Sequence, residues 1–184
     1  KIVATGAEAG DRFGYSVSVS GDVVVVGAYG VDTDGTNAGA AYVYRWNGTI
    51  WDSGTKIVAT GAKAGDFFGR SVSVSGDVVV VGAYGVDTGG TLDTGAAYIY
   101  RWNGSSWNPG TKIVATGAKA SDYFGNSVSV SGDVIVVGAD GEDTWGASAG
   151  AAYIYRWNGS AWDSGTKIFA SEAQATVQFG YSVS

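Results

Sequence analysis

The sequence contains no histidine, cysteine or methionine among its 184 residues, and proline occurs once. Histidine is the commonest general base and metal ligand, and cysteine is a strong nucleophile, so their absence excludes most catalytic and zinc-binding arrangements. Disulfide bonds are excluded too. No run of about 18 apolar residues occurs, so the sequence predicts no membrane-spanning helix.

Positive charge is also scarce. Eleven Lys and Arg stand against 17 Asp and Glu, which gives a formal net charge of −6. A protein that binds nucleic acid needs a basic surface to displace counterions from phosphates. We therefore expect no nucleic-acid partner.

What the chain has in abundance is repetition. The heptapeptide KIVATGA begins at Lys1, Lys56 and Lys112, and a degraded copy, KIFASEA, begins at Lys167. Residues 1–33 and 56–88 differ at only three positions. Internal repeats of this length indicate an array of identical structural units. We divide the chain into repeats at residues 1–55, 56–111 and 112–166 and a partial repeat at 167–184.

Each repeat predicts four strands and no sustained helix. In the first repeat, residues 15–20 (YSVSVS) and 40–46 (AAYVYRW) alternate at the period of a strand, and residues 23–28 (VVVVGA) are apolar on both faces. Residues 21–22 (GD) form a hairpin turn, and residues 51–60 supply the fourth strand. Four antiparallel strands in each repeat of about 55 residues predict the blades of an all-β propeller. The coils of a β-solenoid are shorter, and a sandwich would not repeat its sequence so closely.

The end of the segment FGYSVSVSGDVVVVGAYG, from Phe13 to Gly30, looks like a strand that enters a nucleotide-binding glycine loop. Such a loop occurs once per site and opens a helix. Here the segment recurs in every complete repeat and is followed by a turn-rich stretch. We therefore reject the nucleotide-binding interpretation.

The recurring Phe-Gly and Gly-Ala pairs resemble the FG-GAP repeat, which is found in the propellers of integrin α-chains and in many microbial surface proteins. The pairs are Phe13-Gly14, Phe68-Gly69, Phe124-Gly125, Phe179-Gly180, Gly27-Ala28, Gly82-Ala83 and Gly138-Ala139. The resemblance covers essentially the whole chain. It implies a single propeller domain of about seven blades, located outside the cell or at its surface and used for binding or adhesion.

Metal ligands depart from the integrin pattern. Integrin repeats often carry a calcium loop, Asp-x-Asp-x-Asp-Gly, between the first two strands, but Ser20-Gly21-Asp22 is too short to surround an ion. The segment DTDGTN at 32–37 resembles half a calcium loop, but the other repeats lack the same ligands. We therefore expect no cofactor and no requirement for calcium in folding. Asp11, Asp66 and Asp122 are expected to cap turns.

Two further motifs give candidate site residues. The motif WNGxxW places two tryptophans opposite each other across a hairpin, either as a stabilising pair or as a platform for stacking a sugar beside Arg45, Arg101 or Arg156. The tryptophans are Trp46, Trp51, Trp102, Trp107, Trp157 and Trp162. Asn47, Asn103 and Asn158 each begin Asn-Gly-Ser/Thr, which is both a glycosylation acceptor and a preferred turn sequence.

These observations favour a non-catalytic propeller that binds a protein or glycan ligand outside the cell. The alternatives are a structural module of a surface layer or filament, in which copies of the chain associate, and a lectin that uses the tryptophan pairs. An enzyme is not expected, because nearly identical repeats supply no unique pocket.

The repeat count leaves the ring open. The sequence indicates a fourth strand at Lys1, a first strand that ends at Ser184, and three complete blades between them. Propellers close with about 4–8 blades. We expect the remaining blades to come from a longer chain, which we favour, or from a second copy.

Overall fold

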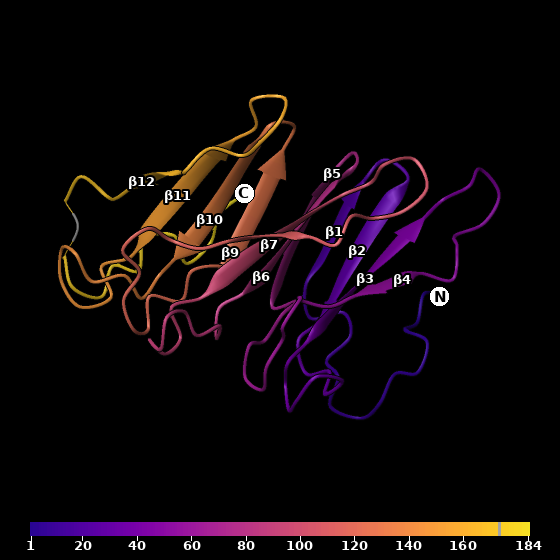
Figure 1. Ribbon diagram of the computed structural model, residues 1–184, viewed down its shortest axis with the longest axis horizontal. Coiled ribbons are helices and arrows are strands. Elements are labelled where there is room, and N and C mark those ends of the chain that lie inside the picture. Colours follow the sequence, from indigo (N-terminus) through magenta and orange to yellow (C-terminus); the bar gives the residue numbers. More distant parts are fainter. Residues whose placement is uncertain (173) are drawn as a thin grey trace.

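The computed structural model describes residues 1–172 and 174–184, and within these ranges the chain is all-β (Figure 1). Each repeat forms one four-stranded antiparallel sheet, called a blade here, with its strands in chain order. Blade 1 contains β1 (Val17–Ser20), β2 (Val23–Ala28), β3 (Ala40–Arg45) and β4 (Thr55–Ile57). Blade 2 contains β5 (Ser71–Ser75), β6 (Val78–Ala83), β7 (Ala96–Arg101) and β8 (Thr111–Ile113). Blade 3 contains β9 (Ser127–Ser131), β10 (Val134–Ala139), β11 (Ala151–Arg156) and β12 (Thr166–Ile168).

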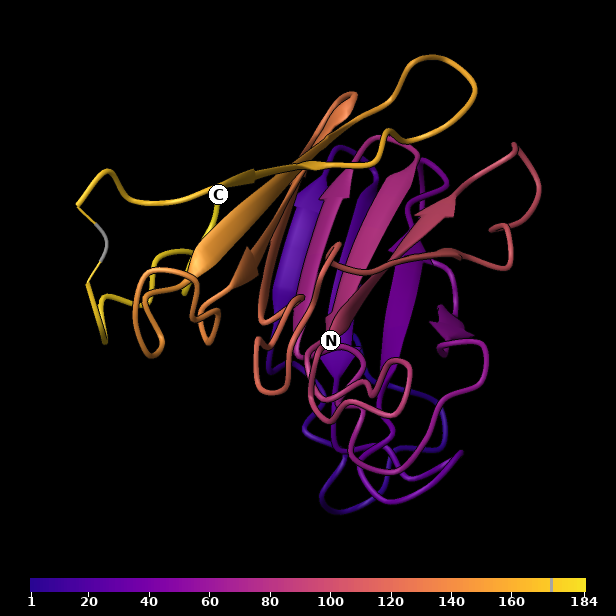
Figure 2. The same ribbon diagram turned by 60° about the vertical axis from the view of Figure 1, so that its left-hand side comes forward.

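The three sheets lie face to face in a propeller-like arrangement, which confirms the predicted fold class (Figures 1 and 2). The described residues include no helix that could cross a lipid bilayer.

The strands differ from the sequence expectation mainly in their lengths. The fourth strand of blade 1 was expected over residues 51–60, but only Thr55–Ile57 pairs with β3. Residues 1–16 and 181–184 contain no named strand, although a fourth and a first strand were expected there. A strand forms only where a neighbouring strand pairs with its backbone, and a sequence pattern does not supply that partner.

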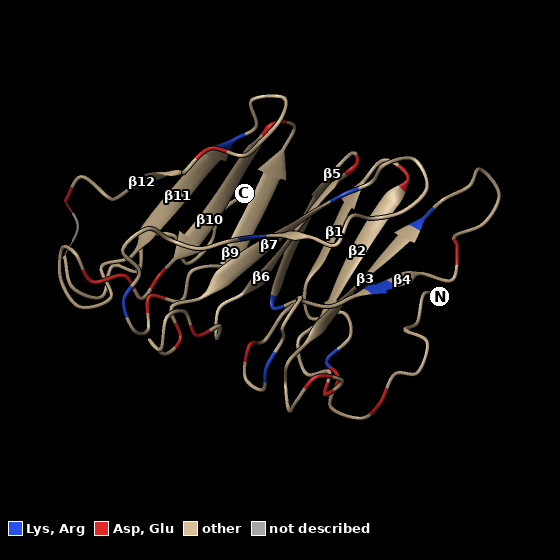
Figure 3. Cartoon of the chain, viewed as in Figure 1, with Lys and Arg blue, Asp and Glu red and all other residues tan. Residues whose placement is uncertain are grey.

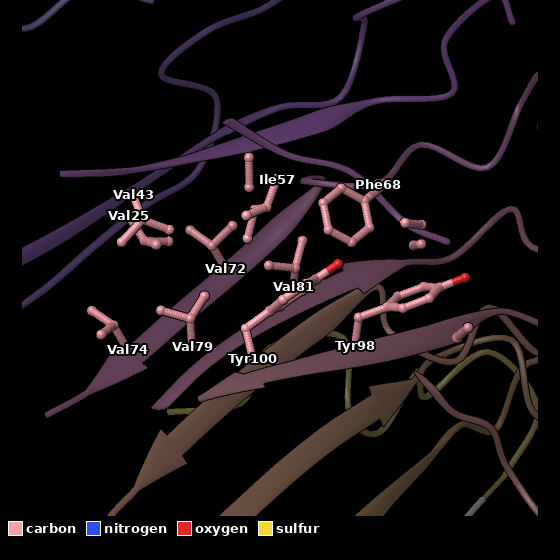
Figure 4. Packing of buried hydrophobic residues seen from close by; sticks show 14 of the residues in the cluster. Val25, Val43, Ile57, Phe68, Val72, Val74, Val79, Val81, Tyr98 and Tyr100 are labelled. Carbon is pink, nitrogen blue, oxygen red and sulfur yellow. The ribbon is translucent and has the colours of Figure 1, made fainter. Parts of the chain in front are cut away.

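The core lies between successive blades. Figure 4 shows Val25 and Val43 of blade 1 facing Val72, Val74 and other side chains of blade 2. The second strand is buried on both faces where it is covered by blades on both sides, and every residue of β6 is buried. Its run of apolar residues therefore reflects packing against two neighbouring sheets, as the sequence predicted.

The Phe-Gly pair joins each blade to the one before it. Phe124 is fully buried between blades 2 and 3, and its ring lies edge-on to Tyr153 with the centroids 5.2 Å apart. Its amide donates to the carbonyl oxygen of Thr94, 3.1 Å away. The following residue, Gly125, lies so close to Gly82 that a Cβ on Gly82 would be 1.9 Å from the Gly125 carbonyl oxygen. The Gly of the Gly-Ala pair is therefore required by close approach of two backbones.

The serines of the first strand accept hydrogen bonds from the first strand of the next blade and from the turn that follows it. The Ser18 hydroxyl oxygen accepts a hydrogen bond from the Val74 amide at 3.1 Å, and the Ser20 hydroxyl oxygen accepts one from the Gly76 amide at 3.0 Å. The same bonds recur between blades 2 and 3, where Ser73 and Ser75 accept from Val130 and Gly132. These hydroxyl groups satisfy amides on an edge strand that has no neighbouring strand to pair with them.

Buried tyrosines predict a loss of stability at alkaline pH. Burial, with a smaller contribution from nearby acidic groups, raises the pKa of Tyr98 and of Tyr155 to about 12, from 10.0 for an ordinary tyrosine. Between these values the unfolded chain loses protons that the folded chain retains, so stability falls as pH rises from about 10 to about 12. We expect the melting temperature, followed by circular dichroism, to drop across this interval. Tyr98→Phe should reduce the drop, and a melting temperature that is constant up to about pH 12 would contradict the prediction.

Candidate functional site

The two ends of the blades carry different groups. The short hairpins that contain the tryptophans lie at one end, whereas the loops that join β2 to β3 and β4 to β5 lie at the other (Figure 1). Charged residues lie mainly in loops and at strand ends (Figure 3). Candidate binding groups therefore fall into two regions, which we call the hairpin end and the loop end.

At the hairpin end, the structure pairs the tryptophans as predicted. Trp46 and Trp51 form an antiparallel bridge with their ring centroids 5.6 Å apart. The pairs in blades 2 and 3 have the same geometry, with centroids 5.5 Å apart. Because all six rings are half-buried, the pairs contribute to packing, and their role in binding a ligand stays a prediction.

Arginines connect these pairs from blade to blade. The Arg45 guanidinium lies 4.6 Å from the ring centroid of Trp102, and the Arg101 guanidinium lies 4.1 Å from that of Trp157. Arg45 also donates to Asp77 at 3.3 Å. The Nη1 atom of Arg101, in contrast, is buried without a hydrogen-bond partner.

A pocket of about 290 Å³ lies beside Arg101, between blades 2 and 3. Its lining includes Trp157, Trp162, Asn108 and Asp163. We call this pocket the rim pocket. It combines two aromatic rings with an arginine and polar groups, and its volume is close to the lower limit of about 300 Å³ for small-molecule sites.

The three asparagines of the Asn-Gly-Ser/Thr sequences lie exposed at the tips of the hairpins. In each, the side-chain oxygen accepts hydrogen bonds from amides two and three residues later, as in Asn47 with Thr49 and Ile50 at 3.0 Å. These contacts define an Asx turn and account for asparagine at this position. Glycosylation of Asn47, Asn103 or Asn158 stays a prediction.

At the loop end, five aromatic rings form a continuous row that sequence reasoning missed. Neighbouring centroids along the row are 4.6, 6.1, 5.0 and 5.8 Å apart. The row, called the aromatic row below, consists of Tyr15, Tyr29, Phe67, Tyr84 and Tyr123. It crosses all three blades, and Tyr15 is 51% exposed.

Arg70 lies over this row. Its guanidinium is 4.4 Å from the ring centroid of Tyr15, 5.5 Å from that of Tyr29 and 5.8 Å from that of Tyr84. Burial raises the pKa of the Tyr84 hydroxyl, and the nearby Arg70 charge opposes that shift. The loop end thus combines a cation held by ring faces with partly exposed aromatic surface.

The aspartates before the Phe-Gly pairs cap turns, as predicted. Oδ2 of Asp11, Asp66 and Asp122 accepts the amide three residues earlier, at 2.8 Å in each blade. In blade 3 the capping aspartate also lies beside two other carboxylates, Glu142 and Asp143. A sequence comparison of the repeats could have found Glu142, because the corresponding residues Val31 and Val86 are apolar.

A comparison with family models finds the FG-GAP repeat in three consecutive segments, residues 1–44, 51–100 and 107–155. These segments contain the first two strands of every blade and all but the last residue of each third strand, whereas β12 lies beyond the last segment. No curated protein matches the chain.

Proposed function

The chain belongs to the FG-GAP repeat family, and from this premise we propose that it is a non-catalytic binding or adhesion propeller that acts outside the cell or at its surface. FG-GAP repeats occur in extracellular binding proteins, and the family is generally non-catalytic. The proposed ligand is a protein or a glycan. The proposed binding surface is the aromatic row together with Arg70.

The distribution of differences between the repeats supports this surface. Residues 1–33 and 56–88 differ at three positions. At two of them, Arg12 of the first repeat corresponds to Phe67 of the second, and Tyr15 corresponds to Arg70. Blade 3 differs again at both of these positions and at that of Tyr84. All of these positions contribute to the loop end, whereas the residues that join the blades are nearly invariant. A surface that varies on a constant scaffold is typical of binding sites.

The chemistry of the row is also suited to recognition. Tyrosine and arginine are enriched among the residues that dominate binding energy, because they combine a large apolar area with hydrogen-bonding groups. Aromatic faces also stack on the apolar faces of sugars. The row presents both kinds of contact without a catalytic group.

Substitutions at the loop end test the proposal. We expect Tyr15→Ala and Arg70→Ala each to weaken binding at least about ten-fold, because truncating an aromatic or arginine residue that dominates an interface typically costs this much. The probes are an array of neutral and acidic oligosaccharides and a phage-displayed peptide library, with affinities of selected probes measured by surface plasmon resonance. Ile50→Ala, at an exposed site in a hairpin of the opposite end, is the control and should change nothing.

The same measurements separate the alternatives. The rim pocket and the unpartnered Nη1 of Arg101 favour a lectin as the second candidate. Sugar binding that is lost in Trp162→Ala and unchanged in Tyr15→Ala would support the lectin and contradict the loop-end site. Ordered polymers with no binding to either library would support a structural module instead.

A further inference from the structure

Three carboxylates meet in blade 3 although they come from two separate loops. Asp122 precedes β9, whereas Glu142 and Asp143 follow β10. One oxygen of each carboxylate lies within 4.8 Å of an oxygen of each of the others. Asp122 and Glu142 are each only 2% exposed, whereas Asp143 is exposed to solvent.

Each buried carboxylate leaves one oxygen without a partner. Oδ2 of Asp122 accepts the Lys119 amide at 2.8 Å, but Oδ1 has no hydrogen-bond partner. Oε1 of Glu142 accepts the Thr144 amide at 3.1 Å and lies 2.7 Å from the Lys167 ammonium, but Oε2 has none. A buried carboxylate oxygen without a partner is costly, so these two oxygens are suited to accept a ligand.

Comparison of the blades shows what is special about the third. The other two have aspartates at the positions of Asp122 and Asp143 but valine, Val31 and Val86, at the position of Glu142. Both valines are buried. Replacing a buried valine by glutamate is unfavourable unless the charge gains partners. Lys167 and Thr144 supply partners for Oε1 of Glu142, and Oε2 is left for a further ligand.

We propose that Asp122, Glu142 and Asp143 bind a hard divalent cation, Ca²⁺. Calcium takes oxygen ligands at about 2.3–2.6 Å, so ligands on opposite sides of the ion lie about 5 Å apart. The carboxylate separations meet that limit. Magnesium binds at about 2.0–2.1 Å and demands a near-ideal octahedral shell, whereas calcium accepts the irregular geometry of ligands from two separate loops. Waters complete the coordination on the exposed side.

The charges of two lysines fit this assignment. Lys119 forms a 2.7 Å ion pair with Asp143, in which both side chains are more than half exposed. Such a surface pair is weak, so the cation displaces the Lys119 ammonium into solvent. Lys167 stays on Oε1 of Glu142, and Oε2 remains for the ion. Three carboxylates and one lysine then leave two negative charges, which Ca²⁺ neutralises.

The surroundings shift the pKa values of the two buried carboxylates in opposite directions. Burial disfavours the charged form of Glu142, but Lys167 and the hydrogen bonds from Thr144 outweigh it and hold the pKa below its ordinary value. Burial raises the pKa of Asp122. A cation beside Asp122 would favour its ionised form.

Isothermal titration calorimetry of chelator-treated protein with CaCl₂ tests the site. We expect one Ca²⁺ per chain with a Kd of about 10⁻⁴–10⁻³ M, the range of extracellular modules. Glu142→Gln keeps the side-chain shape but removes the charge, and it should weaken binding at least about ten-fold. Lys119→Gln should tighten binding, because it removes the competing ammonium. Asp143→Asn, at an exposed position, repeats the test if Glu142→Gln does not fold.

Asp66→Asn is the matched control, since Asp66 is the equivalent buried aspartate in blade 2, where valine replaces the glutamate. It should leave calcium binding unchanged. Absence of calcium binding, or binding that is equal in wild type and Glu142→Gln, would show that the cluster is only an ion-pair network and would overturn the proposal. Equal or tighter binding of MgCl₂ would overturn the assignment to calcium. None of these results depends on the ligand of the aromatic row.

Discussion

Replacing Phe124 by alanine is expected to lower the free energy of unfolding by about 3–5 kcal/mol, the usual cost of removing a fully buried phenylalanine. The ring has no solvent exposure and contacts residues of both blade 2 and blade 3. It also lies edge-on to Tyr153 and Tyr155, with centroids 5.2 and 6.3 Å away. The cavity would lie at the junction of two sheets, where neither sheet can relax into it without separating from the other.

Phe13→Ala is the matched control, because Phe13 has the same place in its repeat but is only half-buried. Its loss should be clearly smaller. Urea unfolding followed by tryptophan fluorescence gives both values. Equal losses in the two variants would show that the ring stabilises its own blade rather than the contact between blades.

Gly82→Ala is expected to cost about 3 kcal/mol, at the upper end of the range for overpacking. The added Cβ would lie 1.9 Å from the Gly125 carbonyl oxygen and 2.3 Å from the Ser71 hydroxyl oxygen. The hydroxyl can rotate, but the carbonyl belongs to the backbone of the next blade. Blades 2 and 3 must therefore move apart, which also weakens the 2.8 Å bond from Ser71 to Gly125.

Gly76→Ala separates this clash from the general effect of adding a methyl group. A Cβ on Gly76 meets nothing within 4 Å, but its φ of +54° disfavours alanine. The strain should cost about 1–2 kcal/mol. Differential scanning calorimetry should show the larger loss for Gly82→Ala, and a smaller loss there than for Gly76→Ala would refute the close-approach explanation.

Much of this fold follows from the sequence, because the same strand and turn patterns occur in each of the three repeats. The alternation in SVSVS and the apolar run in VVVVGA predicted strands, and the Asn-Gly pairs predicted hairpins that place Trp46 opposite Trp51. The valines of SVSVS are buried in β5, which lies between two blades, whereas Val17 and Val19 of β1 are 66% and 68% exposed. These features depend on residues that are near in sequence, where strand period and turn chemistry decide the outcome. The ends of the strands were predicted less accurately, because they depend on pairing with another segment of the chain.

The binding groups were harder to predict because they assemble across blades. Tyr15 and Tyr29 lie 14 positions apart in one repeat, and Phe67 of the next repeat contacts Tyr29. Asp122 and Glu142 are likewise separated by the whole of β9 and β10. No local pattern marks such residues as neighbours. The differences between repeats would have marked many of them, since those differences concentrate at the loop end.

The recurring serine-to-amide bonds and the Gly-to-Gly approach have a consequence for how the array can change in length. Both junctions use the same residues in the same roles, so the surface that blade 1 offers to blade 2 is the one that blade 2 offers to blade 3. A blade gained or lost by in-frame recombination between repeats would meet a matching neighbour without any compensating substitution. The loop end would then acquire a new set of side chains while the junctions stayed the same.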